Sequence, residues 1–172
     1  LRTPLNAVIG FSNAMKCETF GALNEKYIEY ASDINNSGEH LLKLINDILD
    51  VSAVEAGKME LHEENLIVND IVHATSQMVR ERADAGNVSF VSHAPEQLPL
   101  LFADNRRLMQ ILINLLSNAI KFTPPNGEIK FSATLEQGNK HVFRVSDTGI
   151  GMDEEGMQKA MTKFGQVDSG LN

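Results

Sequence analysis

The sequence predicts an α+β protein in two parts, a helical hairpin up to about residue 60 and then an α/β sandwich. Apolar and small residues recur between residues 24 and 57 at alternating steps of four and three, which is typical of a packed helix. The later segments 69–85 and 105–121 have helical spacing as well. Three further segments have the composition of strands and lie beside turn residues: 87–92, 128–136 and 140–147.

The bulk composition is that of a folded acidic protein. Of the 172 residues, 42% are hydrophobic, which is enough for a packed core, and the formal net charge is −8. This charge argues against nonspecific binding to nucleic acid, which needs basic patches. The single cysteine excludes a disulfide within the chain. No apolar run approaches the roughly 18 residues that span a bilayer. We therefore expect a cytoplasmic segment without membrane contact, even if a longer parent is membrane-anchored.

The first part should consist of two helices and a connector. Residues 1–17 form the first helix, and Pro4 inside its apolar pattern should bend it. Residues 18–23 form the connector, and Gly57 is expected as the C′ residue that ends the second helix. The predicted heptad seam of the second helix consists of Tyr27, Ala31, Ile34, Gly38, Leu41, Ile45, Ile48 and Ser52. A hairpin can bury two such apolar faces only by pairing with another, so the sequence predicts a dimeric four-helix bundle.

The second part should mix strands and helices. Residues 58–63 could form a short strand, and residues 93–99 are expected to be a loop. Asp104 is a suitable N-cap for the helix over residues 105–121. After the strand at 140–147, a loop with two glycines leads to a short helix.

A polar stripe runs along the helix predicted at 105–121. Gln110, Asn114, Asn118 and Lys121 are spaced by four, four and three residues, which places them on one face. Asn is a poor helix former, so two of them one turn apart in an apolar helix need a reason. An exposed polar face is one reason. The other is a metal and phosphate site, because an amide oxygen is a hard ligand for Mg²⁺ and a lysine can face phosphate.

The stretch "VSDTGIGM" places Asp147 at a strand end, before Gly149 and Gly151. Asp147 could simply cap the turn, with the glycines present for their backbone geometry. Alternatively, a buried carboxylate there could accept a hydrogen bond from an exocyclic amino group, which would select adenine over guanine. The glycines would then let the backbone approach a planar ligand.

Four sequence boxes resemble those of the sensor histidine kinases of two-component systems. "NLLSNAIKF" resembles the N box, "DTGIGM" the first glycine-rich box, "FGQVDS" at 164–169 the F box and "LRTPLNAVIGF" the H box without its beginning. The boxes stand in the family's order, and residues 20–61 are most like the PleC and DivJ kind of kinase. By this resemblance, residues 1–60 are most of the dimerisation and phosphotransfer hairpin. Residues 61–172 would be the ATP-binding domain, with the fold shared by gyrase, Hsp90 and MutL.

The resemblance also implies roles for individual residues. Asn118 matches the principal Mg²⁺ ligand and Asn114 its partner, while Lys121 matches a phosphate contact and Phe122 the aromatic beside the adenine. Asp147 matches the carboxylate that reads the adenine amino group. Gly149 and Gly151 match glycines of the adenine pocket and lid hinge. Thr3 matches a position that, in many relatives, orients water for dephosphorylation of the partner regulator.

The implied mechanism is in-line phosphoryl transfer from Mg·ATP to a histidine of a bacterial homodimer, then onward to an Asp of a response regulator receiver domain. Related ATPases commonly have Glu at the position of Asn114, where it activates water. Because Asn cannot act as that base, a transferase is favoured over a clamp ATPase. The alternative is a pseudokinase scaffold, which dimerises and binds a regulator without using ATP.

Both ends of the chain depart from the family pattern. The resemblance places the phosphoacceptor His two positions before Leu1 and the second glycine-rich box after Asn172. We therefore expect residues 1–172 alone to bind nucleotide weakly and not to autophosphorylate. None of the chain's own histidines has an H-box position, and each is expected to be an ordinary surface or partly buried residue: His40, His62, His73, His93 and His141.

Overall fold

The computed structural model describes residues 2–160 and residue 162. The chain divides between Glu60 and Leu61 into two compact units, a helical hairpin and an α/β unit. The predicted fold class, a hairpin followed by an α/β part, is confirmed. Within the described residues, no helix is both long and apolar enough to cross a membrane.

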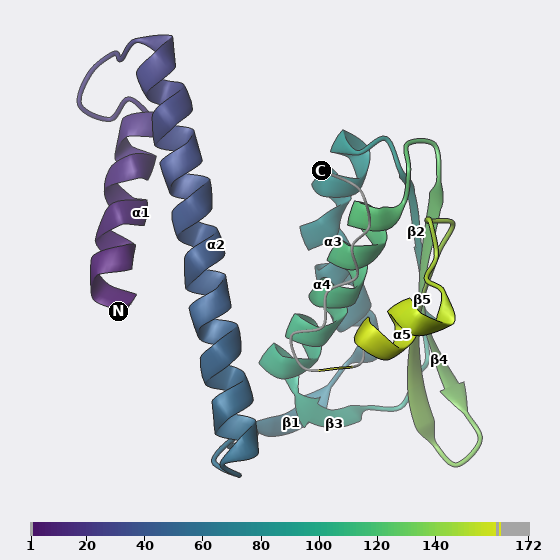
Figure 1. Cartoon of the computed structure of the whole chain (residues 1–172). Helices are drawn as coiled ribbons and strands as arrows, with labels where there is room; N and C mark the ends of the chain where they lie inside the picture. Colours follow the sequence, from purple (N-terminus) through teal and green to yellow (C-terminus); the bar gives the residue numbers. More distant parts are fainter. Residues whose placement is uncertain (1, 161, 163–172) are drawn as a thin grey trace. The chain divides into compact units, whose positions relative to one another are not determined.

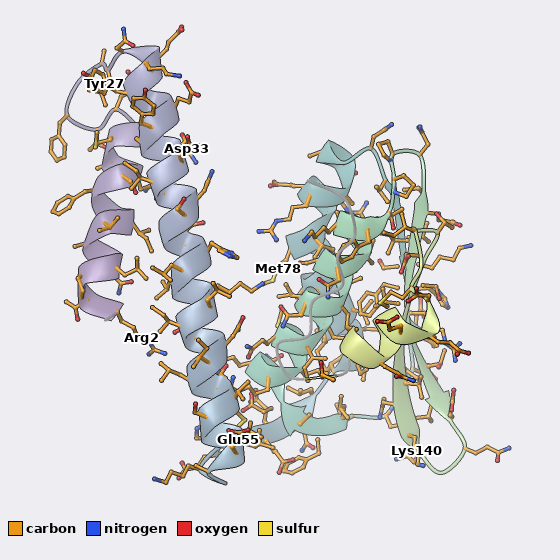
Figure 2. All side chains as sticks on the ribbon, viewed as in Figure 1. Arg2, Tyr27, Asp33, Glu55, Met78 and Lys140 are labelled. Atoms are coloured by element: carbon orange, nitrogen blue, oxygen red, sulfur yellow. The ribbon has the colours of Figure 1, made fainter. Side chains whose placement is uncertain are left out.

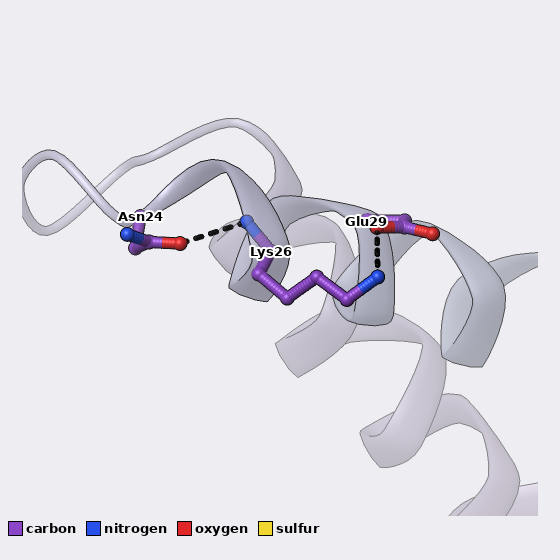
Figure 3. A network of polar contacts seen from close by, with 3 residues as sticks. All are labelled: Asn24, Lys26 and Glu29. Atoms are coloured by element: carbon purple, nitrogen blue, oxygen red, sulfur yellow. Dashed lines mark hydrogen bonds and ion pairs between the residues drawn. The ribbon is translucent and has the colours of Figure 1, made fainter.

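The first unit is a hairpin of α1 (Arg2–Lys16) and α2 (Glu25–Glu55), drawn in Figure 1. Asn24 caps α2, because its side chain accepts a hydrogen bond of 2.9 Å from the Lys26 amide, and Lys26 then pairs with Glu29 (Figure 3). At the other end, Gly57 has a φ of +62°, and its amide donates to the carbonyl of Val54. The expected glycine stop is confirmed. Any bend at Pro4 lies in the first described turn of α1 and stays a prediction.

The predicted heptad seam divides into two faces in the single chain. Ala31 and Gly38 are buried against α1. The seam position that follows each of them stays about half exposed, at 48% for Ile34 and 49% for Leu41. Tyr27, labelled in Figure 2, is exposed in the same way. One helix partner therefore covers only alternate members of the seam, because residues at steps of three and four lie on slightly different sides of a helix.

The second unit contains two sheets and three helices within its described part. In chain order these are β1 (Glu63–Leu66), α3 (Val68–Ala85), β2 (Ser89–His93), β3 (Leu101–Asp104), α4 (Asn105–Phe122), β4 (Glu128–Glu136), β5 (Lys140–Asp147) and α5 (Glu154–Ala160). β1 pairs antiparallel with β3. In the larger sheet, β4 lies between a parallel β2 and an antiparallel β5. α3 and α4 pack on the same face of this sheet (Figure 1).

The core of the second unit lies between these two helices and the larger sheet. Leu112 and Leu116 of α4 and Val79 of α3 meet Ile129 and Phe131 of β4, all of them nearly inaccessible to solvent. Side chains of α4 that enter this core hold the helix at a fixed rotation, which decides which residues α4 presents on its other side.

One predicted strand needs correction, and another strand was not predicted. The strand expected at residues 58–63 begins only at Glu63, because its pairing partner is Leu101–Asp104 and the register places Glu63 opposite Asp104. The region after the loop at 93–99 also contains β3, which was not predicted. Both strands have four residues, and their pairing joins segments about 40 residues apart in the chain. Local sequence patterns cannot predict such a pairing.

Candidate functional site

Asp104 holds the start of α4. It is 7% exposed, and its Oδ1 accepts a 3.0 Å hydrogen bond from the Arg107 amide, which confirms the predicted N-cap. Its Oδ2 accepts a second bond of 3.0 Å from the His62 amide. The His62 and Arg107 amides, with help from the charge of Arg106, lower the pKa of Asp104. One carboxylate thus joins the beginning of the second unit to the first turn of α4.

The predicted polar stripe lies on the solvent side of α4. Leu112, Leu116 and Ala119 are buried, which turns Asn114 and Asn118 outward, one helical turn apart and exposed. Gln110, the next stripe member toward the N-terminus, is half-buried and accepts a 2.9 Å hydrogen bond from an Arg107 guanidinium nitrogen. The sequence did not indicate this arginine as a neighbour of the stripe.

The stripe ends in a cation beside an aromatic ring. The Nζ of Lys121 lies 5.0 Å from the centroid of the Phe122 ring, and Phe122 itself is half-buried. Two exposed apolar side chains, Ile111 and Leu115, flank the asparagines. A face that combines amide oxygens, an ammonium group and apolar surface can contact both the charged and the flat parts of a ligand.

The loop after β5 is tied to the end of α4. Asp147 is the last residue of β5, and its Oδ1 accepts a 2.9 Å hydrogen bond from the Gly149 amide. The Ile150 amide then donates to the carbonyl of Phe122 at 3.2 Å. A Cβ added to Gly149 would lie 2.6 Å from both Asp147 Oδ1 and Phe122 O, so a side chain has no room there. The structure therefore brings Phe122, Asp147 and Gly149 together.

Asp147 differs from the expectation in one respect. The carboxylate is exposed and not buried, although its strand partner Ile129 belongs to the core. The interpretation of Asp147 as a turn cap is supported, because its Oδ1 accepts the hydrogen bond from the Gly149 amide. Recognition of adenine by this carboxylate stays a prediction. Gly151 has a φ of +69°, the left-handed conformation that favours glycine.

A cavity of about 810 Å³ continues from the N-terminal half of the stripe. Gln110 and Asn114 line it, together with residues that sequence reasoning did not assign to a site: His62, Glu64, Met78, Asp104, Asn105, Arg106, Met109 and Ile113. These residues come from β1 and the residue before it, α3, the end of β3 and α4, so their meeting depends on the pairing of β1 with β3. A sequence pattern within one helix could not reveal it.

The remaining predicted site residues lie elsewhere. Thr3 is exposed in the first described turn of α1, in the other unit. The box at 164–169 lies outside the described residues. In the part of the chain that the structure describes, His, Cys, Asp and Glu form no group of three or more that could hold a metal ion. Binding of Mg²⁺ by the amide oxygens of the stripe stays a prediction.

Two family models match this chain. Residues 1–57 match the His Kinase A (phospho-acceptor) domain, and residues 103–172 match the histidine kinase-, DNA gyrase B- and HSP90-like ATPase domain. The chain has the catalytic core of a sensor histidine kinase. The second match begins one residue before the N-cap of α4 and includes both asparagines and the loop at Asp147.

Individual relatives agree with this family. The kinase core is 41% identical over 170 residues to the cell-division control histidine kinase PdhS of Brucella anthropi, which covers 98% of this chain and 16% of the relative. A crystal structure of full-length ShkA in complex with AMPPNP superposes with a TM-score of 0.79 at 30% identity, covering 96% of this chain and 35% of that one. The histidine kinase ThkA, in complex with the response regulator protein TrrA, gives 0.60 at 26% identity, covering 90% and 44%.

Proposed function

We propose that this kinase core transfers phosphate from ATP to a histidine and from there to an aspartate of a response regulator. The chain spans 16% of the length of its PdhS relatives, so the activity of the whole protein is part of this proposal. The related ShkA was crystallised with AMPPNP, which supports the use of ATP. The related ThkA was crystallised with a response regulator, which supports the transfer to a regulator.

One observation supports the ATP-binding part of this proposal. The exposed asparagine stripe of α4 runs to Phe122, and the carbonyl of Phe122 is bonded to the loop that begins at Asp147. A single surface therefore offers amide oxygens at one end and an accessible carboxylate at the other. ATP needs that combination, with a metal at its phosphates and an acceptor for its exocyclic amino group.

The residues fit Mg²⁺ in the manner expected for a nucleotide complex. Asn114 and Asn118 would offer neutral oxygen ligands to the ion, which supplies charge neutralisation at the phosphates when bound. Lys121 would contact phosphate oxygens, and Phe122 would lie beside the adenine that Asp147 recognises. Because neither asparagine can remove a proton from water, transfer to a protein side chain is favoured over hydrolysis.

The half-exposed seam supports a homodimer. Ile34 and Leu41 of α2 line a groove of about 380 Å³ with Leu5 and Val8 of α1, on the side of the hairpin that its own helices leave open. A second hairpin would cover these side chains and complete a four-helix bundle. We thus assign dimerisation and phosphotransfer to residues 1–60, with Thr3 near the end where the reaction takes place. Residues 61–172 would bind ATP.

The test is labelling with radioactive ATP of a chain extended at both ends. We expect an acid-labile, base-stable label that is lost in Asn118→Ala. The matched control is Asn65→Ala, which removes an exposed asparagine from β1 of the same unit and should keep the label. A dimer that binds a receiver domain but acquires no label would overturn the kinase proposal and indicate a scaffold.

A further inference from the structure

A buried polar cluster lies between α1 and α2. Asn35 of α2 is 4% exposed and Ser12 of α1 is 3% exposed. The Asn35 side-chain amide donates to the Ile9 carbonyl at 3.0 Å and to Ser12 Oγ at 3.1 Å. Ser12 Oγ in turn donates to the same Ile9 carbonyl at 3.0 Å. Three polar groups from two helices thus satisfy one another inside an otherwise apolar interface.

This cluster is tied to one axial alignment of the two helices. A shift of α1 by one turn would put Val8 or Lys16 in the place of Ser12, because residues four apart share a helix face. Neither offers a hydroxyl, so the buried amide of Asn35 would lose a partner. A buried polar group that is paired in only one alignment is the known device by which helix pairs specify their register.

The neighbouring glycine reinforces the same alignment. Gly38 lies one turn after Asn35, and a Cβ placed there would be 2.8 Å from Cγ1 of Ile9. The residue whose carbonyl accepts both hydrogen bonds therefore also packs its side chain against the glycine. α1 meets α2 through a hydrogen-bonded contact and a close steric contact at a single level of the hairpin.

We propose that Asn35, acting with Ser12, is a positioning residue that sets the axial register of α1 on α2. This inference rests on the proposed function, in which the reacting end of the hairpin lies at Thr3 and just before it. A slip of one turn moves α1 by about 5.4 Å. A misplacement of about 1 Å can already slow a reaction by about 100-fold, so one register suits phosphotransfer and its neighbours do not.

The test measures register directly, by spin-label distances within one chain. Labels go on Asn6→Cys and Val54→Cys, two exposed positions on different helices, after Cys17→Ser removes the exposed native thiol. Unlabelled chain in excess keeps distances between copies out of the measurement. The comparison is Asn35→Leu against the same substitution at the adjacent exposed position, Asn36→Leu.

We expect one narrow distance for the parent and for Asn36→Leu. Asn35→Leu should show a second population displaced by about 5 Å, one helical turn, without loss of helix content. In the extended chain, Asn35→Leu should lower autophosphorylation at least tenfold and leave the affinity for an ATP analogue unchanged. A single distance identical to the parent's in a folded Asn35→Leu chain would overturn the assignment.

A second variant covers the case in which Asn35→Leu does not fold. Ser12→Ala removes the hydroxyl without adding volume, and it should broaden the distance distribution in the same direction. An unchanged narrow distance in Ser12→Ala would then refute the proposal. The distances are measured without nucleotide, so they separate the two claims. If the register shifts as expected while the extended parent chain acquires no label, the kinase proposal alone is overturned.

Discussion

Gly149→Ala tests the link between the end of α4 and the loop at Asp147. Real Cβ atoms essentially never approach other heavy atoms within 3.0 Å, and this one would lie 2.6 Å from two of them. Asp147 Oδ1 and the Phe122 carbonyl must therefore move away by about 0.4 Å or more. Two hydrogen bonds depend on these atoms, one from the Gly149 amide and one from the Ile150 amide.

Losing both bonds should cost the second unit about 2 kcal/mol, at about 1 kcal/mol for each. For a unit of this size, that lowers the melting midpoint by about 8 °C. If Asp147 also binds the adenine amino group, its displacement removes a charge-assisted hydrogen bond of about 1.5–3 kcal/mol. Nucleotide affinity should then fall by about 10- to 100-fold.

The assay is isothermal titration of an extended chain with a non-hydrolysable ATP analogue, at a temperature where the variant stays folded. Gly138→Ala serves as the control, because Gly138 has a φ of +81° in the β4–β5 turn and an alanine there is strained away from the site. Gly138→Ala should lose stability and keep affinity. Equal nucleotide affinity for Gly149→Ala and the parent would refute the proposed contribution of the Asp147 loop to nucleotide binding.

Three further predictions concern other parts of the chain. Leu116→Ala empties a fully buried position and should lower the unfolding free energy of the second unit by about 2–5 kcal/mol in urea titrations. Gly38→Ala pushes against Ile9 and should destabilise the hairpin by about 1–3 kcal/mol in thermal melts, and an unchanged melt would contradict the close packing. Because the pKa of Asp104 is lowered in the fold, its contribution is complete above the ordinary value of 3.8 and is lost as the pH falls through the folded value. The stability difference between the parent and Asp104→Asn should therefore shrink as the solution is acidified below that value.

The placement of the candidate site residues on α4 could be predicted because the sequence signals are local. The cap at Asp104, the spacing of Asn114 and Asn118 and the following glycine loop each depend on residues within a few turns of one another. Helix periodicity then determines which side chains share a face. The accessible state of Asp147 was not predicted, because the burial of a side chain at a strand end depends on packing that a local sequence pattern does not contain.

The features that escaped prediction depend on distant partners. β1 and β3 have four residues each, too few for a periodic pattern, and each is a strand because the other lies beside it. The cavity lined by His62 and Met78 follows from that pairing. Asn35 looks like a surface residue in the sequence of α2, and its burial follows from the approach of Ser12 on α1.

Because of the divided seam of α2, the melting midpoints of the two units should depend on different concentrations. Ile34, Leu41 and Ile48 are 48%, 49% and 51% exposed in one hairpin, so a large part of its apolar surface is covered only on association. If two hairpins pair as proposed, folding and association of the first unit form one equilibrium, and its melting midpoint rises with chain concentration. The second unit has its own core around Phe131, so its midpoint responds to nucleotide and not to concentration. The first unit would then be stabilised by a higher concentration of the protein in the cell, and the second unit by a higher concentration of nucleotide.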